Sequence, residues 1–149
     1  MLKNSIIELF ERDLTRLKDE INLYTAESKL WITEKEINNS AGNLVLHLLG
    51  NLNHFIGSTL GNSGYVRQRE KEFSNKDIPR QEMLEEIDQT IVTIKNTVGK
   101  MDVEDFNNDY PLEVFKNKGK MKTEFFLVHL TGHLNYHLGQ INYHRRLIG

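Results

Sequence analysis

Cysteine is absent from this chain of 149 residues. Its absence excludes cysteine-ligated zinc fingers, thiol catalysis, disulfide scaffolds and covalently attached c-type haem. Only two prolines occur, Pro79 and Pro111, and neither interrupts a long periodic segment. No run approaches 18 apolar residues and the start has no long apolar stretch, so we expect neither a membrane span nor a signal peptide. We therefore expect a soluble, cytoplasmic protein.

Neither basic nor acidic residues predominate in the chain. Nineteen basic residues stand against 21 acidic ones, which leaves a net charge of −2. No basic run with interleaved aromatic residues is present, so a nucleic-acid partner is not expected. The Glu-x-x-His pairs of di-iron bundles, the HExxH motif, the P-loop and the G-x-S-x-G elbow are missing as well. These absences exclude the corresponding enzyme classes.

The length fits one domain over residues 1–149. A chain of this size buries roughly 68–70% of the surface that its unfolded form exposes, so folding requires no structural metal. A metal bound here would therefore serve function.

Apolar residues recur at the three- and four-residue spacing of amphipathic helices. Four helices are predicted, over residues 2–24, 40–60, 79–99 and 122–147. Ser40 is a suitable N-cap for the second helix, Pro79 fits the first turn of the third, and Gly99 ends it. Because no alternating strand pattern competes, the sequence predicts an all-α fold, a four-helix bundle with long connections.

Histidine is confined to two of these helices. The six are His47 and His54 on the second helix and His129, His133, His137 and His144 on the fourth. At about 100° per residue, the four on the last helix and Gln140 fall within an arc of about 80°, beside a row of leucines. His47, His54 and Asn51 cluster similarly on the second helix. The histidines therefore border the core, and the two polar faces are expected to meet.

Two imidazoles at positions i and i+4 can reach one ion at about 2.0–2.1 Å, and a third from another helix completes a site with open positions. His129 and His137 are about 12 Å apart along the axis, so they cannot share an ion. Spacing leaves open whether His133 pairs with His129 or with His137. Alternatively, the histidines are polar groups at a helix seam, but burying several imidazoles with no evident acidic partner is costly.

A second regularity is internal. The segments HLLGNLNHFIG (47–57) and HLTGHLNYHLG (129–139) agree at six of eleven positions, which fits either a pseudo-twofold pairing or chance. Both contain glycines seven residues apart, at Gly50 and Gly57 and at Gly132 and Gly139. Interior glycine costs a helix about 1 kcal/mol, so we expect close helix crossing or dimer contact there. The tyrosines of the last helix, Tyr136 and Tyr143, are expected to be packing groups, and His54 and His144 structural or rim residues.

Three segments together resemble the DinB-like superfamily of metal-binding four-helix proteins, specifically a branch of unknown function. They are NSAGNLVLHLLGNLNHFIG, LGNSGYVRQREKEF and HLTGHLNYHLGQINYHRRL, and the resemblance covers nearly the whole chain. The family pattern has one ligand histidine on the second helix and an H-x-x-x-H pair followed by Gly-Gln on the fourth. It implies that His47, His133 and His137 bind a divalent ion, commonly zinc or nickel. It also implies a homodimer and kinship with transferases and isomerases that use low-molecular-weight thiols.

Five further residues are candidates for orienting the ligands or contacting a substrate: Asn51, His129, Gln140, Arg67 and Arg69. Asn51 lies one turn after His47 and can orient a ligand or a bound water. A guanidinium from Arg67 or Arg69 can hold a carboxylate, although surface arginines are more often solvated. No general acid or base is evident near the histidines.

Two hypotheses follow. The first is a divalent-metal-dependent enzyme, a thiol S-transferase or a hydrolase, with a three-histidine site and an open coordination position. The second is a non-catalytic metal-binding bundle, such as a stress-related binding protein or a dimeric scaffold. Three imidazoles accept zinc, nickel, iron or copper, so the sequence does not select the metal.

Overall fold

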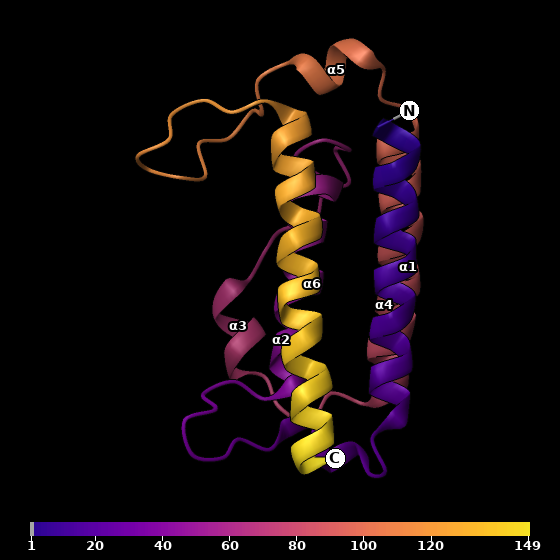
Figure 1. The fold of residues 1–149 in the computed structure, drawn as a ribbon, viewed down its shortest axis with the longest axis vertical. Coiled ribbons are helices and arrows are strands. Elements are labelled where there is room, and N and C mark those ends of the chain that lie inside the picture. Colours follow the sequence, from indigo (N-terminus) through magenta and orange to yellow (C-terminus); the bar gives the residue numbers. More distant parts are fainter. Residues whose placement is uncertain (1) are drawn as a thin grey trace.

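The computed structural model describes residues 2–149, and these are folded into helices joined by irregular segments (Figure 1). Four long helices form the body: α1 Leu2–Leu23, α2 Ala41–Leu52, α4 Arg80–Gly99 and α6 Thr123–Ile148. The first helix packs against α4 and α6, and α2 packs against the same two helices. The predicted all-α fold is confirmed.

The chain direction determines which ends meet. In Figure 1, α1 and α6 run from top to bottom, whereas α2 and α4 run upward. The segment after α2 therefore returns along the length of the bundle before α4 begins, and it carries the short helix α3, Arg69–Ser74. Because α2 and α6 are antiparallel neighbours, the N-terminal end of α2 lies beside the C-terminal end of α6 (Figure 1).

Helix boundaries follow the expected local signals. The hydroxyl oxygen of Ser40 accepts a hydrogen bond from the backbone N–H of Asn43 at 3.2 Å, which confirms Ser40 as the N-cap of α2. Pro79 directly precedes α4, and Gly99 is its last residue. Beyond Leu52 the second helix continues as a π-helical turn, Asn53–Ser58, rather than as regular α-helix.

Three short helices lie in segments that the sequence analysis left as connections. These are a 3₁₀ helix at Glu27–Trp31, α3, and α5 at Val103–Asn107. Each is at most six residues long, too short for a helical period to be recognised in the sequence. The 3₁₀ helix and α3 both pack against α2, whereas α5 packs against α6.

The core between the long helices is apolar, with a few polar residues at the seams. Buried leucines and isoleucines from α1, α2, α4 and α6 make one contiguous cluster. Asp13 of α1 is fully buried and accepts hydrogen bonds from Asn135 of α6 at 2.6 Å and from Arg12 at 2.8 Å. This contact ties α1 to α6 on the side away from α2. No helix within residues 2–149 is both long and apolar enough to cross a membrane.

Candidate metal centre

Three histidines from α2 and α6 meet at one point. Nε2 of His133 lies 3.3 Å from Nε2 of His47 and 3.2 Å from Nε2 of His137. One ring nitrogen from each lies within 4.8 Å of the other two, and among the described residues no other histidine or carboxylate joins this group. Of the two pairs that spacing left open, His133 and His137 are the pair that lies in this group, and His129 lies outside it.

These separations fit a bound ion. Two nitrogens at about 2.0–2.1 Å from one tetrahedral zinc are about 3.3 Å apart, which matches the two measured distances. Three protein nitrogens supply three of four tetrahedral positions. The arrangement thus has the ligand count of a catalytic zinc site, in which the fourth position takes water or substrate.

Hydrogen bonds on the far side of two rings direct their Nε2 lone pairs toward the shared point. Nδ1 of His47 lies 3.1 Å from Oε1 of Glu72, and Nδ1 of His137 lies 2.7 Å from Oε1 of Gln140. Both acceptors are oxygens, so Nδ1 carries the proton in each ring and Nε2 is left with its lone pair. Nitrogen lone pairs converging this closely repel one another unless a cation or a proton lies between them.

His133 is held neutral by its surroundings. Burial, together with the neighbouring His137, His47, His129 and Arg67, lowers its pKa to about 4, and burial is the largest of these causes. Burial also lowers the pKa of His137. Both rings are thus deprotonated at neutral pH, as metal ligands must be. Nδ1 of His133 is buried without a hydrogen-bond partner, and so is Oδ1 of Asn51.

Glu72 is the charged residue of the site that the sequence analysis missed. Its Oε1 accepts from both Nδ1 of His47 and Nη2 of Arg67, at 3.1 and 2.9 Å, and its Oε2 accepts from Nε of Arg67 at 2.8 Å. Burial alone would raise the pKa of Glu72, but the hydrogen bonds from His47 and Arg67 outweigh burial and lower it. The carboxylate therefore stays charged and aligns the His47 ring.

The position of Glu72 is fixed by a buried amide on α2. Nδ2 of Asn43 donates to the backbone carbonyls of Glu72 and Asn75 at 2.9 and 2.8 Å. Its Oδ1 accepts from the hydroxyl of Ser40 at 2.7 Å and from the ammonium group of Lys76. Because Asn43 is fully buried, these bonds hold the C-terminal end of α3 against the start of α2.

Gly50 makes room for the same carboxylate. A Cβ atom at this position would lie 2.6 Å from Cδ of Glu72, closer than side chains approach. Close approach was predicted at Gly50 and is confirmed, but the neighbour is α3 rather than another long helix. At Gly132 and Gly139 the expected close approach within the chain is wrong, since an added Cβ meets nothing within 4 Å. Contact with a second copy there stays a prediction.

Other candidates lie around the three histidines. His129 is exposed, one turn before His133, with its ring 5.0 Å from the ring of Phe115. Arg67 is largely buried against Glu72. Its guanidinium therefore holds the carboxylate that orients His47 and is not free to bind the carboxylate of a substrate. Arg69 is exposed, its guanidinium carbon 6.0 Å from the centre of the Phe73 ring.

The two remaining histidines have no part in the cluster, as predicted. His144 is buried, with Nδ1 2.6 Å from the hydroxyl of Tyr24 and Nε2 2.8 Å from the carbonyl oxygen of Ile32. It therefore fixes the segment after α1. His54 is half-buried at the edge of the bundle, beside the Phe55 ring.

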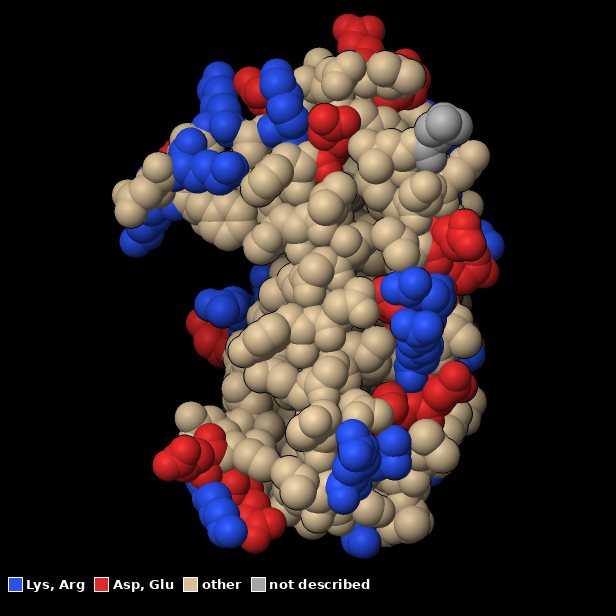
Figure 2. Space-filling view, in the orientation of Figure 1, with Lys and Arg blue, Asp and Glu red and all other residues tan. Residues whose placement is uncertain are grey.

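Two loops project from one side of the molecule. Figure 2 shows two projections on one side of the molecule, which by their place in Figure 1 are the loop before α6 and the loop before α2. The surface of α6 between them carries few charges in this view. Tyr136 and Tyr143 on α6 are exposed, so the prediction that they are packing groups is wrong.

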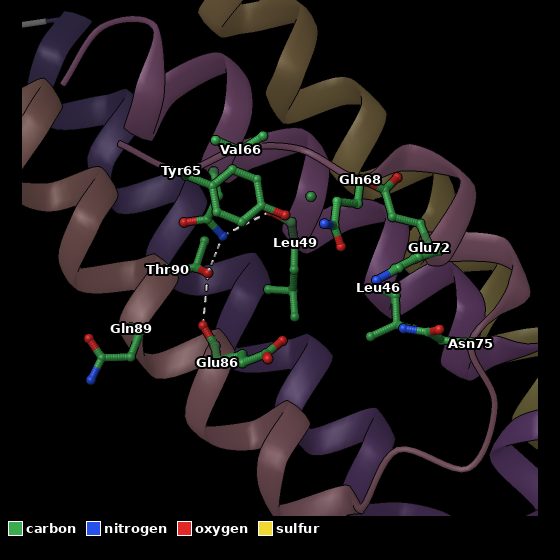
Figure 3. Close-up of a pocket in the computed structure, with 13 residues that line it drawn as sticks. Leu46, Leu49, Tyr65, Val66, Gln68, Glu72, Asn75, Glu86, Gln89 and Thr90 are labelled. Atoms are coloured by element: carbon green, nitrogen blue, oxygen red, sulfur yellow. Dashed lines mark hydrogen bonds between the residues drawn. The ribbon is translucent and has the colours of Figure 1, made fainter. Parts of the chain in front are cut away.

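Glu72 also lines a cavity whose walls include none of the three clustered histidines. This cavity, about 420 Å³, lies between α2, α3 and α4 (Figure 3). In Figure 3, Tyr65 and Glu86 approach it from different elements, and Thr90 receives a hydrogen bond from Asn53 at 2.9 Å. Glu72 thus borders both this cavity and the histidine cluster.

Comparison with known proteins identifies a family. The model of a family described as "Protein of unknown function (DUF1572)" matches residues 2–149. Neither the curated proteins nor the solved structures give any match.

The contact between Gly50 and Glu72 gives a paired prediction. Gly50→Ala should lower the free energy of unfolding by about 1–3 kcal/mol, because the displaced carboxylate loses buried hydrogen bonds. Gly132→Ala, also inside a helix but with open space around it, should be neutral or stabilising by about 0.5–1 kcal/mol. Urea denaturation measures both. Equal stability of the two variants would mean that Gly50 does not make room for Glu72.

Proposed function

Because the chain belongs to this family of unknown function, its activity has to be inferred from the site, and we propose that it is a divalent-metal-dependent enzyme. The proposed ligands are Nε2 of His47, His133 and His137. The observation that carries the proposal is the convergence of these nitrogens at 3.2 and 3.3 Å, with an oxygen atom at hydrogen-bond distance from Nδ1 of both His47 and His137.

Zinc and nickel are the expected metals, and iron and copper also accept three imidazoles. A divalent ion held by three neutral imidazoles keeps its full charge, and when bound it lowers the pKa of a water or thiol at its open position. Since the site offers three protein ligands, that position is left for water, a thiol or a substrate. This ligand count favours an enzyme over a structural metal site.

The residues of the chain have separable tasks in this proposal. Glu72 holds the proton of His47 at Nδ1, which fixes the ring orientation and strengthens Nε2 as a donor. Arg67 neutralises Glu72, so the buried pair adds no net charge beside the ion. Gln140 performs for His137 the task that Glu72 performs for His47.

The reaction class follows from the activated nucleophile. We place the chain with the DinB-like proteins and propose transfer to a low-molecular-weight thiol, a thiol S-transferase activity, or hydrolysis by a bound water. Both reactions need a deprotonated nucleophile at neutral pH and do not require a protein nucleophile, which fits a chain without cysteine.

The first test is metal content. Protein purified without added metal should contain about one divalent ion per chain by elemental analysis, and His133→Ala should abolish this. His129→Ala is the matched control, because His129 lies on the same helix one turn away and outside the cluster. Failure of the parent protein to retain or take up an ion, or retention by His133→Ala, would refute the ligand assignment.

The second test concerns Glu72. Glu72→Gln preserves the size of the side chain and an oxygen acceptor but removes the charge, so metal affinity should fall by about 10- to 100-fold. Glu70→Gln, an exposed position on the same helix, should leave the affinity unchanged. Competition with a zinc chelator measures both affinities. An unchanged affinity in Glu72→Gln would show that the carboxylate does not tune the site.

A further inference from the structure

A cavity of about 530 Å³ adjoins the metal centre along the C-terminal half of α6. Its walls are α6, the segment of residues 36–39, and Leu44 at the start of α2. His137 and Gln140 both line it, so the cavity begins at a proposed metal ligand and at the residue that orients this ligand.

The α6 wall carries large side chains that the core does not use. Tyr136, Tyr143 and Leu147 are 66%, 64% and 73% exposed, and all three line this cavity. Single exposed apolar residues are ordinary on protein surfaces. Here three share one helix face, at positions i, i+7 and i+11, with Gln140 between the first two, and all of them border one cavity. A group of exposed large side chains around one cavity is typical of a binding site.

The charge of the lining limits what the cavity can take. No lysine or arginine lines it, and the only carboxylate is that of Glu36. The lining therefore offers an anionic group no lysine or arginine, and the guanidinium carbon of Arg146, outside the lining, lies 5.1 Å from the centre of the Tyr143 ring. An uncharged apolar group can bury its surface against the tyrosines and Leu44.

The dimensions fit part of a small molecule. Ligand sites commonly enclose about 300–1,000 Å³, and the volume of this cavity lies within this range. From His137 to Leu147 the α6 wall extends about 15 Å at 1.5 Å per residue. An extended group can thus reach from the metal centre toward the C-terminal end of the helix.

We infer that this cavity binds an uncharged, aromatic or similarly apolar group of the substrate, while the reacting end of the same molecule occupies the open position at the metal. The inference rests on the proposed function and adds the substrate class to it. Tyr136 and Tyr143 are then specificity-determining residues, and the metal ligands are shared by every substrate.

Two hydroxamic acids test this in the zinc-loaded protein. Benzohydroxamic acid and acetohydroxamic acid have the same metal-binding head, but only the first has a ring for the cavity. The aromatic probe should bind about tenfold tighter or more, the gain expected from burying one ring. In the double variant Tyr136→Ala, Tyr143→Ala the ratio of the two probe affinities should fall to about twofold or less. The preference that remains comes from the lining residues that were not changed.

Phe125→Ala is the control, because Phe125 is another exposed aromatic residue of α6 that does not line the cavity. In Phe125→Ala the ratio of the two probe affinities should equal that in the parent protein. Equal binding of the two probes to the parent protein, or a ratio that survives the double variant, would overturn the inference. If the two tyrosines instead form a contact between two copies of the chain, the double variant should separate a dimer into monomers. The ratio of the two probe affinities should then stay unchanged.

A metal-independent measurement keeps the two proposals distinct. Benzyl alcohol, which has the ring but no metal-binding head, is titrated into His133→Ala protein and followed by NMR. Shifts at Tyr136, Tyr143 and Leu147 support the cavity even if the parent protein binds no ion. Absence of these shifts at millimolar benzyl alcohol counts against the cavity even if the metal site is correct.

Discussion

The hydrogen bond between Glu72 and Nδ1 of His47 is the interaction on which the rest of the site depends. It sets the tautomer of one proposed ligand, places a negative charge beside the cluster and requires Arg67 as a counter-charge. It also explains two otherwise costly features of α2, the fully buried amide of Asn43 and the interior glycine at position 50. A short polar helix, α3, thus becomes part of the proposed metal centre because it carries this one carboxylate.

The long helices and the histidine face are predictable because they depend on regular spacing. Residues three and four apart share a face, so the core leucines and the row of histidines at positions 129, 133 and 137 follow from the sequence. The N-cap at Ser40 is equally local. The choice of His137 over His129 was implied by family resemblance alone, since spacing permits both. The structure brings His137 to the cluster and leaves His129 exposed.

Glu72 was not predictable, because it is one acid among several in a charged segment and nothing local marks it as buried. The only signal was the unexplained glycine at position 50, which marks a close neighbour without identifying it. The exposed Tyr136 and Tyr143 were misjudged for a related reason. Aromatic residues on a helix usually pack inward, and only the positions of the neighbouring segments show that these two rings face a cavity.

X-ray absorption at the metal edge of the zinc-loaded protein tests the central claim most directly, because it counts the ligands and measures their distances. Three imidazole nitrogens at about 2.0–2.1 Å and one further light atom are predicted. His137→Ala should remove one imidazole, and His129→Ala should leave the spectrum unchanged. A shell with fewer than three imidazoles, or one that is identical in His137→Ala, would contradict the account.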